Sequence, residues 1–294
     1  MKTHTGARSR YISSLLLLAL LATALLGMAE PAGASMPGDN GKIAYVTTRN
    51  GAYEIYAMNT DGTGQTRLTN STEYEENPAW SPDGSKIAYD GNGIRVMNAD
   101  GTGQTSMAWG NRGDSTWSPD GTKIAYGRDS QIWVRNANGG EETNLTNNFI
   151  VADVVSPAWS PDGSKIAYAT NRDGDFEIYV INTDGSGVTR LTSNGIADGR
   201  PDWSPDGSKI VFTSYAYGDY DPPEIYVMNA DGSGQTNLSR NSSYDHYPAW
   251  SPDGSRIAFA SYRGGPLDIY TMNPDGSGVT RITRDGSNNF QPAW

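Results

Sequence analysis

Polar residues that could bind a ligand or react gather in six short segments, each just ahead of a recurring tryptophan. The candidate residues in these segments are Glu75, Glu76, Asn77, Arg112, Asp114, Asp153, Asp198, Arg200, Asp245, His246, Tyr247, Asn289 and Gln291. Carboxylates mixed with two arginines could attract a cationic protein loop or a metal ion. Two carboxylates at a suitable separation could also act as acid and base on a glycosidic bond.

The composition disfavours most catalytic mechanisms. The 294-residue chain has no cysteine, and His246 is the only histidine after the first 34 residues. Cys–His nucleophiles and His-rich metal sites are therefore excluded, and no Gly-x-Ser-x-Gly elbow occurs. A carboxylate pair such as Asp198 with Asp245 is the catalytic alternative that the composition allows, although nothing in the spacing singles it out. We expect a protein that is not an enzyme and carries no cofactor.

Aromatic residues outside the repeat register add possible anchors for a partner. Tyr215, Tyr217 and Tyr220 lie in the longest insertion of the chain, and Trp109 stands apart from the repeated positions. Tyrosine buries a large area at little entropic cost, so these four residues join the candidate partner-binding set. Trp133, in contrast, occupies the position held elsewhere by Tyr56 or Tyr179 and is expected in the core.

The elements that position these residues are repeats. Tryptophan recurs at 80, 117, 159, 203, 250 and 294, at spacings of 37 to 47 residues, which is typical of four-stranded propeller blades. Each unit contains four short runs rich in Tyr, Ile, Val and Thr, such as Lys-Ile-Ala-Tyr and Glu-Ile-Tyr-Val-Met-Asn. The middle runs are apolar on both faces, as sheets stacked between two neighbours require. The sequence predicts an all-β protein with six four-stranded antiparallel blades.

Two turn motifs predict which loops share a face of the propeller. Ser-Pro-Asp-Gly should join the first and second strands of a blade, and Asn-x-Asp-Gly the third and fourth. Both turns then share one face, and the candidate residues should ring the mouth of the central channel on the other face. The Asp-Gly-Ser-Gly stretches allow Ca²⁺ ligation as an alternative to a purely structural turn, but they lack the spacing of an EF-hand loop.

The two ends of the repeat array complement each other. Gln291-Pro292-Ala293-Trp294 restarts the motif, whereas Gly41-Lys42-Ile43-Ala44-Tyr45 begins in mid-repeat. We expect the C-terminal strand, Gln291 to Trp294, to complete the N-terminal blade and close the ring, because closure hides the sheet edges.

The first 34 residues have the pattern of a secretory signal peptide. Basic residues precede an apolar run from Ile12 to Leu26, and Ala32-Gly33-Ala34 resembles a cleavage site, so we expect a mature chain from Ser35. The alternative is an uncleaved membrane anchor over Ile12 to Ala29. Cleavage changes the net charge from −11 to about −13, which disfavours nucleic acid as a partner and favours a soluble monomer. The predicted location is the periplasm or the exterior.

The repeat is similar to that of a known family. Pro-Ala-Trp-Ser-Pro-Asp-Gly-Ser-Lys-Ile-Ala-Tyr followed by Glu-Ile-Tyr-Val-Met-Asn-x-Asp-Gly resembles the WD40-like PD40 repeat of the TolB propellers, over residues 41–294. The resemblance implies a six-bladed propeller over residues 35–294, in the bacterial envelope, that holds a protein or peptide partner such as an envelope lipoprotein. Only Ser35 to Gly41 precede the first blade, so we expect the α/β domain of TolB to be missing.

These features lead to three hypotheses, the last of which is a scaffold stabilised by Ca²⁺. The first is a non-catalytic binding module that holds a partner at the channel mouth. The second is a glycan-binding or glycan-cleaving propeller that uses carboxylates of the same face.

Overall fold

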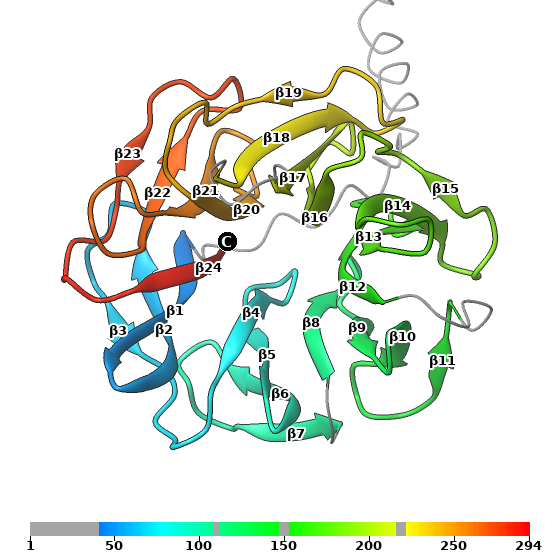
Figure 1. Cartoon of the computed structure of the whole chain (residues 1–294). Helices are drawn as coiled ribbons and strands as arrows, with labels where there is room; N and C mark the ends of the chain where they lie inside the picture. Colours follow the sequence, from blue (N-terminus) through cyan, green and yellow to red (C-terminus); the bar gives the residue numbers. More distant parts are fainter. Residues whose placement is uncertain (1–40, 109–111, 147–152, 216–221) are drawn as a thin grey trace, which may run out of the picture. The chain divides into compact units, whose positions relative to one another are not determined.

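The computed structural model describes residues 41–108, 112–146, 153–215 and 222–294. These residues form six four-stranded antiparallel sheets arranged in a ring (Figure 1). The predicted fold class is confirmed. The described part of the chain includes no apolar helix of membrane-spanning length.

Each blade runs outward from an inner strand to an outer strand. Blade 1 consists, in that order, of β24 (Asn289–Ala293), β1 (Lys42–Asn50), β2 (Ala52–Asn59) and β3 (Thr66–Arg67). Blade 2 consists of β4 (Glu76–Trp80), β5 (Lys86–Gly91), β6 (Gly93–Asn98) and β7 (Thr105–Ala108). Blade 3 consists of β8 (Arg112–Trp117), β9 (Lys123–Arg128), β10 (Gln131–Asn136) and β11 (Glu142–Asn144).

The second half of the ring repeats this order. Blade 4 consists of β12 (Val154–Trp159), β13 (Lys165–Thr170), β14 (Glu177–Asn182) and β15 (Thr189–Arg190). Blade 5 consists of β16 (Ala197–Trp203), β17 (Lys209–Tyr215), β18 (Glu224–Asn229) and β19 (Thr236–Asn237). Blade 6 consists of β20 (Asp245–Trp250), β21 (Ile257–Ser261), β22 (Asp268–Met272) and β23 (Thr280–Arg281).

The ring closes through the C-terminal strand, as predicted. Strand β24 pairs with β1, so that Phe290 lies opposite Val46 and Asn289 opposite Thr47. Apolar clusters bury the seams between neighbouring blades, and one of them joins Ile269 of blade 6 to Tyr45 of blade 1. The seam that contains both ends of the propeller is therefore packed like the others, and β1 has an inner neighbour, as the second strand of every other blade has.

The middle strands are buried on both faces, as their composition predicts. Every residue of β14 from Glu177 to Ile181 is buried, because the sheet is covered by a blade on each side. Trp133 shares the cross-strand register of the tyrosines, since it lies opposite Tyr126 as Tyr179 lies opposite Tyr168. It packs against the apolar cluster between blades 2 and 3.

The two turn motifs lie at one end of the strands, which we call the hairpin face. In all five Ser-Pro-Asp-Gly turns the serine hydroxyl donates to the aspartate Oδ1 over 2.6 Å, and the backbone N–H two residues after that aspartate donates to the same oxygen over 3.0 Å. The glycine adopts φ near +70°, for example 69° at Gly207, which disfavours any side chain. The opposite face, which carries the connections between blades, is called the variable face.

Candidate functional site at the channel mouth

The inner strands share an unusual backbone position at the variable face. One non-glycine residue in each of these strands adopts a left-handed conformation with φ between 50° and 55°: Asn77, Asp114, Ser156, Arg200, Tyr247 and Gln291. Each strand is irregular at this point, and in five of the six the next residue is proline. Proline disfavours the helical region for the residue before it, but a left-handed non-glycine residue still costs of order 1 kcal/mol or more. The fold holds the same strained backbone six times with six different side chains.

These six residues and the residue that follows each of them line a pocket of about 130 Å³ on the axis of the ring. We call this pocket the channel mouth. The inner strands β4, β8, β12, β16, β20 and β24 surround the centre in Figure 1. Because each blade contributes one side chain, the mouth presents two amides, a carboxylate, a hydroxyl, a guanidinium and a phenol around one small opening.

Contacts between blades connect the mouth side chains. Arg200 Nη1 lies 3.3 Å from Asp114 Oδ1, and the Ser156 hydroxyl donates to Asp114 Oδ2 over 2.8 Å. The Arg200 guanidinium also lies over the Tyr247 ring, 4.2 Å from its centroid, a cation–π arrangement. The Gln291 side chain accepts a hydrogen bond from the Asn77 backbone over 3.0 Å. The mouth is thus a cross-linked set rather than six independent loops.

Carboxylates next to the mouth are held in an environment that favours their neutral form. Burial raises the pKa of Glu76, and the charge of Arg200 opposes that rise. Asp90, on β5, accepts hydrogen bonds from the Asn77 side chain over 2.7 Å and from the Asp114 backbone over 2.8 Å. Burial and the nearby Asp114 charge raise the pKa of Asp90 well above its usual range.

The side of the mouth formed by blades 5 and 6 is aromatic. The His246 ring lies 6.0 Å from the ring of Tyr215, 6.0 Å from that of Tyr244 and 5.6 Å from that of Tyr247. Tyr244 is 49% exposed. Burial, followed by the Arg200 charge, lowers the pKa of His246 to about 4, so the imidazole is neutral at physiological pH. The surface therefore offers large amphipathic rings beside a polar pocket, a combination typical of protein interfaces.

Four of the predicted site residues lie beneath this surface rather than on it. Glu75, Asp198, Asp245 and Asn289 are fully buried, two positions before the left-handed residue of their strand. Arg263 Nη2, for example, lies 2.7 Å from Asp245 Oδ2. Burial raises the pKa of Asp198 to about 6. These side chains support the mouth from inside the blades.

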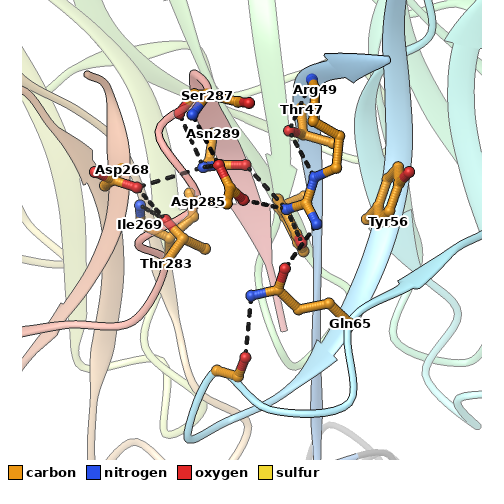
Figure 2. Close-up of polar contacts among 12 residues, drawn as sticks. Thr47, Arg49, Tyr56, Gln65, Asp268, Ile269, Thr283, Asp285, Ser287 and Asn289 are labelled. Atoms are coloured by element: carbon orange, nitrogen blue, oxygen red, sulfur yellow. Dashed lines mark hydrogen bonds and ion pairs between the residues drawn. The ribbon is translucent and has the colours of Figure 1, made fainter.

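Figure 2 shows one such buried network at the seam between blades 6 and 1. The Asn289 amide donates to Asp285 over 3.1 Å and to Asp268 over 3.4 Å, and Arg49 donates to the Asn289 oxygen over 3.4 Å. Arg281 and the Thr283 hydroxyl also bond to Asp268, which is fully buried. Asn289 thereby connects the first strand of blade 1 to the third strand of blade 6.

The remaining predicted residues are placed less centrally. Arg112 begins β8, where its backbone pairs with Arg128. Asp153 is exposed before β12 and accepts a hydrogen bond from the Ser130 hydroxyl over 2.7 Å. Trp109, Tyr217 and Tyr220 lie outside the described residues, so they stay predictions.

Sequence reasoning missed two residues of the site. Ser156 is equivalent to Arg200 and Tyr247 but carries no charge or ring that draws notice. Its position in the repeat could have identified it, because it stands three residues before Trp159 and just before a proline. Asp90 could be found only from the structure, since it comes from a second strand. Within the described ranges, no three His, Asp or Glu side chains are grouped so as to hold a metal ion.

The fold and the mouth together define a six-bladed β-propeller with one repeated face and one variable face. The chain belongs to the PD40 family, described as the TolB β-propeller domain, whose pattern matches residues 27–149, 92–221 and 217–294. The family resemblance of the repeat is confirmed.

Relatives and solved structures agree with this membership. A TolB homologue of Chlorobaculum tepidum is 33% identical over 154 residues, which cover 52% of this chain and 27% of that protein. The Tol-Pal system protein TolB of Sodalis glossinidius is 47% identical over 51 residues, or 16% of this chain and 12% of that protein. The chain thus matches less than a third of the length of either relative.

Similar solved structures share the fold. TolB from Acinetobacter baumannii superposes with a TM-score of 0.73 at 23% identity, covering 86% of this chain and 66% of that one. A TolB-like structure from Agrobacterium tumefaciens gives 0.70 at 24% identity, with coverages of 82% and 88%. An oligogalacturonate lyase in complex with manganese gives 0.55 at 18% identity, with coverages of 85% and 75%. The same architecture therefore serves both TolB proteins and enzymes.

Proposed function

We propose that this chain is a non-catalytic binding module of the bacterial cell envelope that holds a protein or peptide partner at the channel mouth. The observation that carries the proposal is the set of six different side chains on one repeated, left-handed backbone position. A position that repeats in backbone but not in side chain can vary its contacts without disturbing the fold. That is the property a recognition surface needs.

The chemistry of the mouth supports a polypeptide as the ligand. A polar pocket of about 130 Å³ lies below the range of 300–1,000 Å³ typical of drug-sized ligands. It suits a single side chain or a chain end inserted from a larger partner. The neighbouring rings of Tyr215, Tyr244 and Tyr247 supply area for the rest of that partner.

The location follows from the N-terminal sequence and the family. A signal-like segment over residues 1–34 would export the propeller, and the relative from Sodalis glossinidius is a Tol-Pal system protein. We infer that the protein is periplasmic or secreted and that its partner is an envelope lipoprotein.

Site-specific photo-crosslinking tests this placement. A photoreactive amino acid replaces Tyr244 on the variable face or, as the matched control, Asn138 in an exposed turn of the hairpin face. Both baits are exposed to the envelope fraction of the host. We expect a partner that is captured from position 244 but not from position 138, and whose capture falls when Arg200→Ala is added. Equal capture from both positions would place the binding surface elsewhere.

A further inference from the structure

A second pocket of about 200 Å³ lies on the channel axis at the hairpin face. We call it the chamber. Most of its lining consists of tryptophans and of the corner prolines of the Ser-Pro-Asp-Gly turns, and the rest is polar. The tryptophans are Trp117, Trp159, Trp203 and Trp250, and the polar residues are Thr116, Ser160, Asp202, Ser204 and Ser251. Those prolines, such as Pro161 and Pro205, are partly exposed, so the chamber opens between the turns. It is separate from the mouth, whose lining ends at the residue after each left-handed position.

Asp202 is the one charged residue that lines this chamber. Asp202 stands two residues after Arg200, at a position where four other blades carry alanine: Ala79, Ala158, Ala249 and Ala293. The sixth blade carries Thr116, which also lines the chamber. Asp202 Oδ2 accepts the backbone N–H of Trp250 over 2.7 Å. Asp202 is partly exposed and lines the chamber.

Asp202 has no basic partner among the residues that the structure describes. Glu54, Glu177 and Asp268, in contrast, are each paired with an arginine of the same blade. None of the ion pairs in the described part of the chain includes Asp202. A carboxylate enclosed by Trp and Pro without a counter-charge is costly, so the site calls for a cation.

We propose that the chamber binds an organic ammonium group, whose charge pairs with Asp202 and whose apolar stem packs against the tryptophans and prolines. The volume fits such a ligand, because a cavity of about 150 Å³ already accommodates benzene. Aromatic walls also attract cations through their ring quadrupoles.

The number of oxygen atoms available as ligands in the chamber favours an ammonium group over a metal ion. Ca²⁺ requires six to eight oxygen ligands. The serine hydroxyls of the wall are already engaged, since those of Ser160, Ser204 and Ser251 donate to the aspartates of their own turns and each accepts a backbone N–H over 2.9 Å. One carboxylate and one threonine hydroxyl are too few for a calcium site but suffice to orient –NH₃⁺.

Titration with n-butylammonium chloride tests the proposal on the full chain. The readouts are tryptophan fluorescence and the melting temperature, in phosphate buffer free of other amines. Sodium chloride controls for ionic strength, and n-butanol is the neutral isostere. We expect a saturable change with butylammonium alone, weakened about tenfold or more in Asp202→Ala because the ion pair is lost. This variant restores the residue found in four other blades, so it should fold.

Two further variants isolate the site. Asp206→Asn removes an exposed carboxylate of the neighbouring turn and should leave butylammonium binding unchanged. Arg200→Ala alters the mouth and should also leave it unchanged, so this result does not depend on the function proposed above. Absence of saturation in the unmodified protein, or equal saturation in Asp202→Ala, would overturn the proposal.

A last arm identifies the source of the ammonium. Nα-acetyl-lysine methylamide presents the same group on a blocked amino acid. If it competes with butylammonium, the chamber accepts lysine side chains of a polypeptide. If only butylammonium binds, the chamber takes free amines. Both results require Asp202 and support an ammonium site.

Discussion

The two faces of this propeller differ in what repeats from blade to blade. On the hairpin face both the residues and their contacts repeat, so that five turns have the same two hydrogen-bond lengths to their aspartate. On the variable face the backbone repeats, with φ of 50–55° in every blade, while the side chain changes each time. This contrast supports the proposal that the variable face, rather than the repeated turns, recognises the partner.

The largest expected effect lies in the buried layer beneath the variable face. Asp268→Ala removes an acceptor that Thr283 and Asn289 share (Figure 2) and that also bonds to Arg281. Arg281 would lose its ion-pair partner, and the buried Thr283 and Asn289 side chains would each lose an acceptor, so the free energy of unfolding should fall by about 3–5 kcal/mol. Urea denaturation measures the loss.

The matched control is Asp285→Ala in the same network. Asp285 is partly exposed and pairs with Arg49 at the surface. Its removal should cost no more than about 1 kcal/mol. Equal losses for Asp268→Ala and Asp285→Ala would show that burial does not distinguish the two carboxylates.

The second effect concerns the chamber and depends on pH. Burial raises the pKa of Asp202 to about 6, against an ordinary value of 3.8, so the folded protein binds this proton more tightly than the unfolded chain. Ionisation of Asp202 therefore destabilises the fold above pH 6, and this penalty disappears as the pH falls toward 3.8. Asp202→Asn should gain about 1–3 kcal/mol at pH 7.5 and nothing near pH 4. Thermal melts across this range, without amines, give the comparison; a gain that is independent of pH would contradict it.

The turn aspartates should respond to pH with the opposite sign. Hydrogen bonds from Ser204 and from the Ser208 backbone lower the pKa of Asp206 below 3.8. Its stabilising contribution is therefore complete above that pH and is lost as the pH falls through the folded-state pKa. Asp206→Ala should cost about 1 kcal/mol at pH 7, limited by solvent exposure, and less at pH 3. Partner capture and butylammonium binding should not change.

A smaller effect tests the strain at the mouth. Tyr247 holds φ of 55°, where alanine is strained and glycine is not. Tyr247→Gly and Tyr247→Ala both remove the ring, but the glycine variant should be more stable by about 0.5–1 kcal/mol after its larger unfolded-state entropy is counted. At Val155, which precedes the left-handed residue of blade 4, the order should reverse, with alanine more stable than glycine. The same order at both positions would remove the argument for a shared strained backbone.

Much of the fold was predictable because the sequence repeats its own constraints. The Trp spacing predicted six blades, the two Asp-Gly motifs predicted the hairpins, and Gln291 to Trp294 predicted the closing strand. The turns and strands within each blade follow from neighbouring residues, whereas the blade number and the closing strand follow from the repetition of one motif along the chain.

The site was less predictable because it depends on alternation within an irregular strand. Asp198 and Asp245 were assigned to the surface by their charge, yet they point into the blades, two positions from Arg200 and Tyr247. Three other buried acids could have been predicted from the sequence. Glu54, Glu177 and Asp268 each have an arginine 13 residues later, and each pairs with that arginine. The only sign of Asp202 in the sequence is that it stands where four other blades carry alanine.

The most direct test of the central claim compares the two faces in a single capture experiment. One bait carries alanine at Glu76, Arg200, His246 and Tyr247 on the variable face. A matched bait carries alanine at Lys86, Asn138 and Lys209 on the hairpin face, and all baits are checked for equal melting temperature within a few degrees. The account predicts that a partner bound by the unmodified protein is lost only from the variable-face bait. Loss from the hairpin-face bait alone would contradict it.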